Sequence, residues 1–139
     1  MGPHDYFTER VKSFAQKHQL SDQVEFIHDA DDHELAVLYE QAEALIQPSF
    51  AEGFGLPILE ATSFQKPIIA SELPVFKELL GNDTFYAFNP HDISSMTSAI
   101  ETFITDTKKK RVPKGILDSF SFDTMAKRIW TLYKEELGI

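Results

Sequence analysis

The sequence predicts an α/β fold: a three-layer, Rossmann-like domain in which a parallel sheet is flanked by helices. Short apolar runs alternate along the chain with longer segments whose apolar residues recur every three or four positions. The short runs are typical of buried strands, and the longer segments are typical of amphipathic helices. Their alternation along the chain indicates βαβ units. With 139 residues, 42% of them hydrophobic and 25% charged, we expect one domain over residues 1–139 with a core of its own.

Four short apolar runs are the candidate strands, at residues 24–27, 44–46, 67–70 and 84–88. The runs at 44–46 and 67–70 are expected to be covered on both faces, as strands of parallel sheets usually are. Right-handed crossovers place the loop after each strand at the same edge of the sheet. The loops expected to line this rim are 28–32, 47–56 and 71–74.

Six segments are the candidate helices, and polar residues, proline or glycine mark most of their ends. The first runs from Asp5 to about Leu20, the second begins at Asp31 or Asp32 with Glu34 in its first turn, and the third begins at Pro57. The fourth covers residues 75–80 and ends at Gly81, the fifth begins at Asp92, and the sixth begins at Ser121. The last helix carries an apolar stripe that includes Phe122, Trp130 and Tyr133. We expect this stripe to pack in the core.

The stretch from Pro48 to Ala61 is the centre of the functional prediction. It reads as a strand end, a loop with Gly53 and Gly55, and a helix opening at Pro57. Both glycines are expected to allow backbone angles and close approaches that side chains would forbid. Open α/β sheets bind ligands where a parallel strand leads into a helix, and the free N–H groups there suit a phosphate.

Two carboxylates belong to this stretch, Glu52 in the loop and Glu60 in the helix. Glu60 lies in an almost wholly apolar run, and a carboxylate is seldom buried without a partner. A polyol such as a ribose or a hexose would donate hydroxyl hydrogens to both acids. The alternative is that Glu60 faces the solvent and Glu52 caps the helix, and the residues by themselves favour neither reading.

Residues 44–61 read ALIQPSFAEGFGLPILEA, with seven residues between Glu52 and Glu60. This block closely resembles the signature of family-4 retaining glycosyltransferases with the GT-B fold. The likeness continues through Glu34-Leu35-Ala36, Pro67-Ile68-Ile69-Ala70-Ser71, Pro74-Val75 and Ser121-Phe122. The resemblance therefore implies the C-terminal, nucleotide-sugar-binding domain of such an enzyme.

The resemblance implies a role for each residue of the block. Glu60 would hydrogen-bond the ribose of a nucleotide-diphosphate sugar, while Glu52, as the catalytic residue, would hold hydroxyls of the transferred hexose and steady positive charge at the reacting carbon. The main-chain N–H groups that would meet the donor belong to Gly53, Phe54, Gly55 and Leu56. Ser49 and His28 are further donor-binding candidates, and His28 departs from the glycine usual in the family.

The resemblance also implies a partial domain. In the family, further strand and helix units come first and carry a basic pair that clamps the donor diphosphate, and nothing before Asp5 can supply them. We therefore expect that these units and the N-terminal acceptor domain are absent, and that the isolated chain is inactive. The implied partners are a nucleotide-sugar donor, a carbohydrate or glycolipid acceptor, and the missing N-terminal domain.

Composition excludes several other classes. A formal net charge of −9 argues against a surface that binds nucleic acid. There is no cysteine, hence no disulfide or thiolate chemistry, and no apolar stretch of membrane-spanning length. We expect a cytoplasmic location, with membrane association only through the parent enzyme, peripherally at the inner face.

Two polar clusters have competing explanations. Residues 28–33, HDADDH, could ligate a metal but are better explained as a strand-end loop and a helix cap, so we expect neither a metal nor another cofactor. Residues 108–111, KKKR, could bind anionic lipid or phosphate, and a solvated linker is the favoured explanation.

The resemblance thus implies the donor-binding part of a retaining glycosyltransferase that moves a hexose to a hydroxyl acceptor, in polysaccharide or glycolipid biosynthesis. One alternative is a non-catalytic sugar-nucleotide-binding or interaction module on the same scaffold. Another is a structural fragment without affinity for a ligand.

Overall fold

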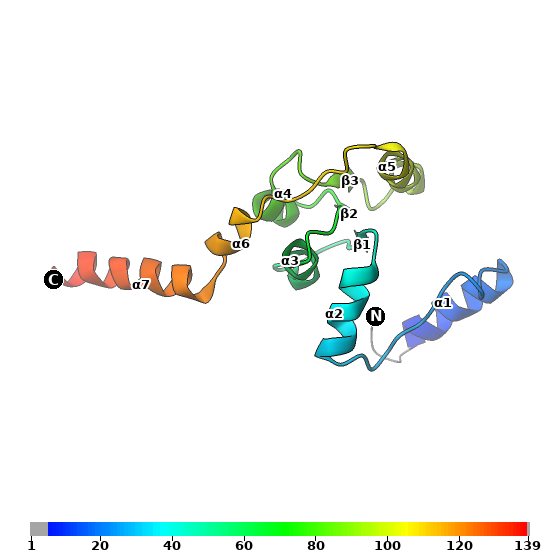
Figure 1. The fold of residues 1–139 in the computed structure, drawn as a ribbon, viewed down its shortest axis with the longest axis horizontal. Helices are drawn as coiled ribbons and strands as arrows, with labels where there is room; N and C mark the ends of the chain where they lie inside the picture. Colours follow the sequence, from blue (N-terminus) through cyan, green and yellow to red (C-terminus); the bar gives the residue numbers. More distant parts are fainter. Residues whose placement is uncertain (1–5, 139) are drawn as a thin grey trace. The chain divides into compact units, whose positions relative to one another are not determined.

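The computed structural model describes residues 6–138, which divide into two compact units within Met1–Gln41 and Ala42–Ile139 (Figure 1). We call them the first unit and the second unit and describe each by itself. The expected helix start at Asp5 lies outside the described residues. Among the described helices, none combines the length and the apolar character that crossing a membrane requires.

The first unit contains two helices, α1 (Tyr6–Lys17) and α2 (Asp32–Gln41). A reciprocal pair of hydrogen bonds opens α2: the backbone N–H of Glu34 donates to Asp31 Oδ1 at 2.8 Å, and that of Asp31 donates to Glu34 Oε2 at 3.0 Å. This capping box satisfies two N–H groups that lack a partner within the helix. The predicted start of this helix and the role of Glu34 are confirmed.

The predicted strand at 24–27 is wrong. These residues belong to no helix or strand, and the ladders in the described part of the chain lie within the second unit. An extended segment becomes a strand only by pairing with a neighbouring backbone, and its apolar residues alone do not supply that neighbour.

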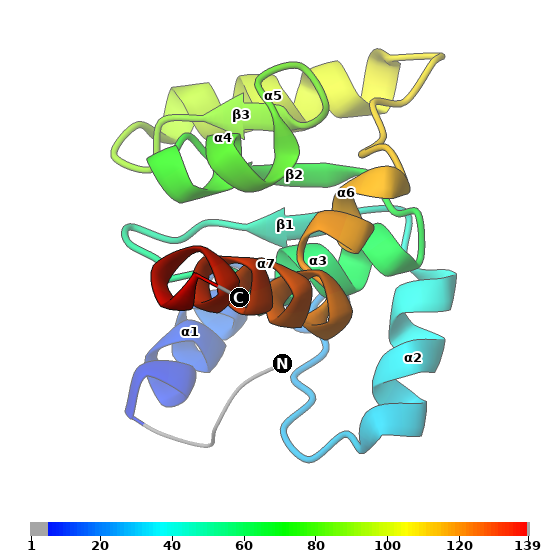
Figure 2. The same ribbon diagram turned by 90° about the vertical axis from the view of Figure 1, so that its left-hand side faces the viewer.

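The second unit is built on a parallel sheet of β1 (Leu45–Gln47), β2 (Ile68–Ser71) and β3 (Tyr86–Phe88). β2 lies in the middle, with Ile46 opposite Ile69 on one side and Tyr86 opposite Ile69 on the other (Figure 2). Every residue of β2 is buried. The three remaining predicted strands are confirmed, with the shifts at their ends that such assignments usually show.

β1 differs from the prediction that both of its faces are covered, because the Ile46 side chain is 45% exposed. Ile46 lies opposite Ile69, which packs against the helix α5 (Ile93–Thr105). Within the described residues α5 packs mainly on β3 and β2, so the same face of β1 is left open. β1 is an edge strand here, and that explains its half-buried pattern.

Helices cover both faces of the sheet. The remaining helices of this unit are α3 (Leu56–Ser63), α4 (Pro74–Leu80), α6 (Gly115–Ser119) and α7 (Phe122–Leu137). Figure 1 shows α5 on one face and α3 and α4 on the other. The core on the α5 side consists of Ile69, Tyr86, Phe88, Ala99 and Phe103. The predicted three layers are therefore confirmed.

Two predicted helix ends are also confirmed. Gly81 ends α4 with a φ of 83°, a conformation that suits glycine. Asp92 precedes α5, and its Oδ1 accepts a hydrogen bond from the backbone N–H of Ser94 at 2.9 Å. An aspartate at this position satisfies one of the free N–H groups of the first turn.

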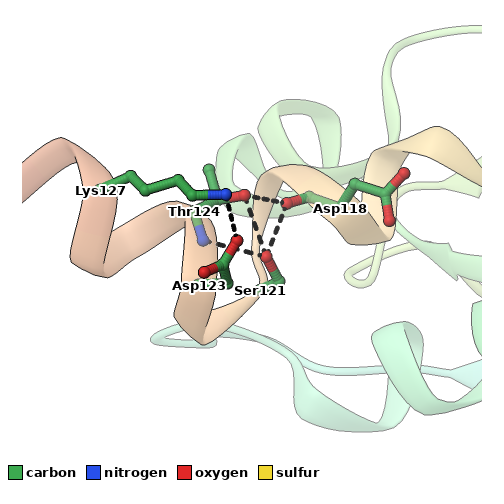
Figure 3. Close-up of polar contacts among 5 residues, drawn as sticks. All are labelled: Asp118, Ser121, Asp123, Thr124 and Lys127. Atoms are coloured by element: carbon green, nitrogen blue, oxygen red, sulfur yellow. Dashed lines mark hydrogen bonds and ion pairs between the residues drawn. The ribbon is translucent and has the colours of Figure 1, made fainter.

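A polar junction joins α6 to α7 (Figure 3). Ser121 Oγ accepts from the backbone N–H of Thr124 at 3.2 Å, which confirms Ser121 as the cap of α7. The hydroxyls of Ser121 and Thr124 both donate to the carbonyl oxygen of Asp118, at 3.0 and 2.7 Å. The junction is therefore held by two side chains at the start of α7 that donate to the main chain of α6.

The predicted packing of α7 in the core is wrong. None of its described residues is buried, and Phe122, Trp130 and Tyr133 are 85%, 56% and 59% exposed. Its main contact within the second unit is with α6. The apolar stripe of α7 therefore has no layer of this unit to pack against.

The basic run at 108–111 is not a solvated linker. Three of its cations donate to main-chain carbonyl groups: Lys109 to those of Phe103 and Ile104, Lys110 to that of Phe85, and Arg111 to that of Gln65. Phe85 and Gln65 precede strands, so these carbonyls lie towards the amino edge of the sheet. The run ties helix and strand ends together at the edge opposite the loop that carries Glu52.

Tyr86 links β3 to this basic run. Its hydroxyl donates to Asp106 Oδ2 at 2.7 Å and accepts from the backbone N–H of Lys110 at 3.0 Å. Burial raises the pKa of Tyr86, and the bond to Asp106 raises it further. The same bond is the largest cause that lowers the pKa of Asp106.

We predict that this pair stabilises the second unit fully between about pH 4 and about pH 10. Because the pKa of Tyr86 is raised, the contribution of Tyr86 to stability is lost as the pH rises above 10. Because the pKa of Asp106 is lowered, the contribution of Asp106 is lost as the pH falls below 4. Tyr86→Phe should lower the free energy of unfolding by about 1 kcal/mol at neutral pH. In urea titrations the difference from wild type should shrink towards pH 3, and a constant difference would contradict the prediction.

Candidate functional site

The segment from Pro48 to Gly55 leaves the carboxyl end of β1 and enters the N-terminus of α3. Gly55 is the N-cap residue, and its φ of 92° turns the chain into the helix. Pro57 lies in the first turn, and the backbone N–H of Ile58 donates to the Gly55 carbonyl at 3.0 Å. The predicted order of strand, loop and helix is confirmed.

The two glycines of the loop differ in the space that a side chain would have at each position. A Cβ atom on Gly55 would lie 2.7 Å from Phe76 Cε1, whereas one on Gly53 would meet nothing within 4 Å. Gly53 is also not among the described glycines with positive φ. The predicted need for glycine is therefore confirmed at Gly55. At Gly53 neither the backbone angle nor a protein neighbour requires glycine, and the close approach expected there stays a prediction.

Glu52 is half-buried, and two neighbouring side chains hold one of its oxygens. Its Oε1 accepts from Ser49 Oγ at 2.8 Å and from Gln47 Nε2 at 3.0 Å. Gln47 Nε2 also donates to Ser49 Oγ at 2.9 Å. Glu52 does not cap α3, whose N-cap Gly55 makes no side-chain bond. The carboxylate is therefore set in place by the end of β1 and the loop.

Glu60 lies on the exposed side of α3. The buried residues of this helix are Ile58, Ala61 and Thr62, whereas Glu60 is exposed together with Leu56 and Ser63. Helical spacing explains the difference, since residues four apart share a face. The apolar neighbours that suggested burial turn inwards, and the carboxylate of Glu60 does not need a ligand to compensate for burial.

The remaining predicted residues of the loop are mostly accessible. Leu56 and Phe54 are 61% and 42% exposed, and Phe54 packs edge to face with Phe120 at a centroid distance of 5.9 Å. This contact joins the loop to the residue that follows α6. The Ser49 hydroxyl donates its hydrogen to Glu52, so its direct effect is on the Glu52 carboxylate and not on a ligand.

Phe50 and His91 form a further contact outside the predicted site, and their rings pack at a centroid distance of 5.2 Å. Phe50 follows β1 and His91 follows β3, and both are exposed. A signal was available, because both residues come soon after parallel strands and therefore lie at the same edge of the sheet.

His28 belongs to the first unit, where it is half-buried and precedes the capping box of α2. Its predicted contact with the donor stays a prediction. Within this unit an open hollow of ≈ 470 Å³ is lined by apolar residues of both the 24–30 segment and α2, with Glu25, Asp29, His33 and Glu34 at its polar side. Among the described residues, no three histidine, cysteine or acidic side chains are grouped closely enough to hold a metal ion.

Known proteins resemble this chain in sequence. The family model of glycosyl transferases group 1 matches residues 6–114. The O-antigen chain mannosyltransferase RfbU of Salmonella typhimurium is 46% identical over 83 residues, which are 60% of this chain and 23% of that protein. The serotype-specific mannosyltransferase WbdA of Escherichia coli is 33% identical over 97 residues, which are 70% of this chain and 12% of that protein.

Solved structures resemble the chain in fold. The sucrose-phosphate synthase of Thermosynechococcus elongatus has a TM-score of 0.77 and 26% identity, covering 94% of this chain and 34% of that one. A glycosyltransferase of Rickettsia africae has a TM-score of 0.77 and 24% identity, covering 96% of this chain and 37% of that one. The chain thus spans little more than a third of either structure, and less than a quarter of the two mannosyltransferases.

The match extends well beyond the Glu52 loop, since residues 6–114 include the three strands of the second unit and the helices from α1 to α5. The fold agrees with it, because a parallel sheet with helices on both faces is what the solved relatives share with this chain. The chain belongs to the glycosyl transferases group 1 family and has the fold of GT-B glycosyltransferases.

Proposed function

We propose that the chain is the donor-binding part of a retaining glycosyltransferase, within the C-terminal half of a GT-B enzyme. The observation that carries the proposal is the arrangement after β1. There a fixed carboxylate, an open main chain and a helix N-terminus follow one another within one loop. This edge of a parallel sheet is where α/β proteins bind ligands.

Each part of the loop has a task in this proposal. Glu52 holds hydroxyls of the transferred sugar through its remaining oxygen and steadies positive charge at the anomeric carbon. The main-chain N–H groups from Gly53 to Leu56 and the dipole of α3 favour the negative charge of the leaving diphosphate. Glu60, on the exposed side of α3, accepts from the ribose hydroxyls. No metal or other cofactor has a task in this scheme.

The diphosphate also needs cations. Lys77 of α4 is paired with Glu72, which follows β2. Lys109, Lys110 and Arg111 are committed to carbonyl groups towards the opposite edge. We therefore propose that the basic pair of the family is supplied by other parts of the complete enzyme. The isolated chain would then bind the donor weakly and turn over none of it.

The sugar we propose is mannose, and the process is polysaccharide assembly on the cytoplasmic side of a membrane. RfbU and WbdA are both named as mannosyltransferases, and RfbU as one that acts on the O-antigen chain. The acceptor is then a carbohydrate or a glycolipid with a free hydroxyl group.

The test is turnover by the complete enzyme that contains this chain, with mannose linked to guanosine or uridine diphosphate as the donor. The double variant Glu52→Ala/Glu60→Ala should abolish turnover and leave the far-ultraviolet circular dichroism unchanged. The anomeric configuration of the product, read by NMR, should match that of the donor. Inversion would refute the retaining reaction, and full turnover by the double variant would refute the site.

A second candidate is a non-catalytic interaction module, and the exposed apolar stripe of α7 favours it. A module of this kind would bind its partner through α7 and would not depend on Glu52 or Glu60. Calorimetry of the chain with guanosine and uridine diphosphates separates the two, because only the donor-binding function predicts heat that the double variant loses.

A further inference from the structure

The side chain of Gln47 has no task in the function proposed above, yet it contacts the central carboxylate of the site. Gln47 is the last residue of β1, and its Nε2 lies 3.0 Å from Glu52 Oε1 and 2.9 Å from Ser49 Oγ. All three side chains are half-buried. We propose that Gln47 is a positioning residue: with Ser49, it holds the Glu52 carboxylate in the orientation that binds the transferred sugar. This inference rests on the proposed function.

The direction of each hydrogen bond in the network follows from the chemistry of the groups. A carboxylate only accepts hydrogen bonds, so the amide NH₂ of Gln47, not its oxygen, faces Glu52. Both acceptors lie within hydrogen-bond distance of this group, Glu52 Oε1 at 3.0 Å and Ser49 Oγ at 2.9 Å. The Ser49 hydroxyl hydrogen then points to Glu52 Oε1, at 2.8 Å. Each of the three contacts thus joins a donor to an acceptor, and together they form a closed triangle that includes Glu52 Oε1.

The network selects one oxygen of Glu52. Oε1 accepts two hydrogen bonds, while no described residue donates to Oε2. The carboxylate plane is fixed by the two donors, and Oε2 is left to accept sugar hydroxyls. Because the orientation is set before the donor arrives, binding does not have to order this side chain.

The Gln47 side chain is anchored by the strand β1 and not by the loop that carries Glu52. Gln47 lies opposite Ala70 in the ladder between β1 and β2, and Ala70 is fully buried. The hydroxyl of Ser71, also fully buried, lies 3.5 Å from the Gln47 carbonyl oxygen. The backbone of Gln47 therefore has less freedom than that of Glu52, which follows it in an irregular segment. This is the geometry expected of a group that positions another one.

The experiment measures donor kinetics of the complete enzyme with Gln47→Leu, which has a similar volume and no donor. We expect kcat/KM to fall by about 10- to 100-fold, because hydrogen bonds to a charged group are lost. Ser49→Ala should act in the same direction. In a Glu52→Ala background Gln47→Leu should cause no further loss, since Gln47 acts through Glu52.

A charge change gives a readout that a purely structural role would not produce. Gln47→Glu places a second carboxyl group about 3 Å from Glu52, and two such groups cannot both ionise readily. The variant should be least active at high pH and recover activity as the pH is lowered. Asn82→Asp, an equivalent exchange at an exposed turn of the same unit, should keep the wild-type pH profile.

The outcomes distinguish a failure of the proposed function from a failure of the role assigned to Gln47. An inactive wild-type enzyme overturns the proposed function and this inference with it. An active wild type with Gln47→Leu within threefold of its kcat/KM, or with an added loss in the Glu52→Ala background, overturns the inference alone. If Gln47→Leu lowers the melting temperature strongly, the pH profile of Gln47→Glu decides, and a wild-type profile there overturns the inference.

Discussion

Replacing Gly55 by alanine is expected to lower the free energy of unfolding of the second unit by about 2–5 kcal/mol. Two independent costs add up. A side chain at a φ of 92° is strained by about 1–2 kcal/mol whatever space it has. The new Cβ atom would also lie 2.7 Å from Phe76 Cε1, closer than real Cβ atoms come, and overpacking of this kind costs about 1–3 kcal/mol.

Phe76 cannot relieve this contact by turning away. Its side chain is fully buried in α4, and Leu79 Cδ1 lies 3.8 Å from the same Cβ position. The backbone at the N-terminus of α3 must therefore shift to remove the close contact, and this is also the proposed phosphate site. We therefore expect Gly55→Ala to weaken donor binding in addition to stability.

Gly53→Ala is the matched control, because its Cβ atom would meet nothing within 4 Å. Its effect on stability should stay within about 0.5 kcal/mol. Urea unfolding followed by circular dichroism compares the two variants directly. Phe76→Leu should cost less stability in the Gly55→Ala background than in the wild type, because it removes the ring atom that the new Cβ atom meets and leaves the backbone strain unchanged. Equal stabilities of Gly53→Ala and Gly55→Ala would contradict this account.

Local sequence signals predicted the elements of the second unit well. Gly81, Asp92 and Ser121 mark helix ends through their own backbone or side-chain chemistry, and all three do so in the structure. Pro57 marks the opening of α3 in the same way. These features depend on a few neighbouring residues, so periodicity and capping rules are enough to find them.

Features that depend on a partner could not be predicted from the same patterns. The 24–27 segment has the composition of a strand but no strand beside it, and α7 has an apolar stripe but no layer beneath it. Ile46 is exposed for a related reason, since α5 does not extend over β1. Composition shows what a segment can do, whereas pairing and coverage depend on what lies next to it.

The candidate site shows the same division. The loop and its two glutamates are recognisable from spacing, and the position of Gly55 follows from the turn into a helix. The network of Gln47, Ser49 and Glu52 is not recognisable, because it depends on how the irregular segment after β1 turns the Ser49 and Glu52 side chains towards Gln47. Its geometry appears only once the backbone is known.

The single substitutions of the two glutamates should have different kinetic effects in the complete enzyme. Glu52→Gln should lower kcat by about 100-fold or more, since it removes a fixed negative charge at the point where positive charge develops. Glu60→Gln should raise the KM for the donor by about 10-fold and change kcat little, because the ribose contact is equally present before and in the transition state.

The structural basis for this difference is the way in which each carboxylate is held. Glu52 is half-buried, and two neutral side chains donate to Oε1, so its charge acts in a partly desolvated and ordered setting. Glu60 lies on the exposed side of α3, where solvent screens its charge and its contribution is mainly one of hydrogen bonding.

Steady-state kinetics with the nucleotide sugar as the varied substrate measure both effects. Glu101→Gln is the matched control, because Glu101 is exposed on α5 at the other face of the sheet and should leave both constants unchanged. Reversed effects, with Glu60→Gln lowering kcat and Glu52→Gln raising only KM, would exchange the proposed roles. Equal and small effects of both would contradict a charged contact to the donor, and the fixed orientation of Glu52 would then serve the loop alone.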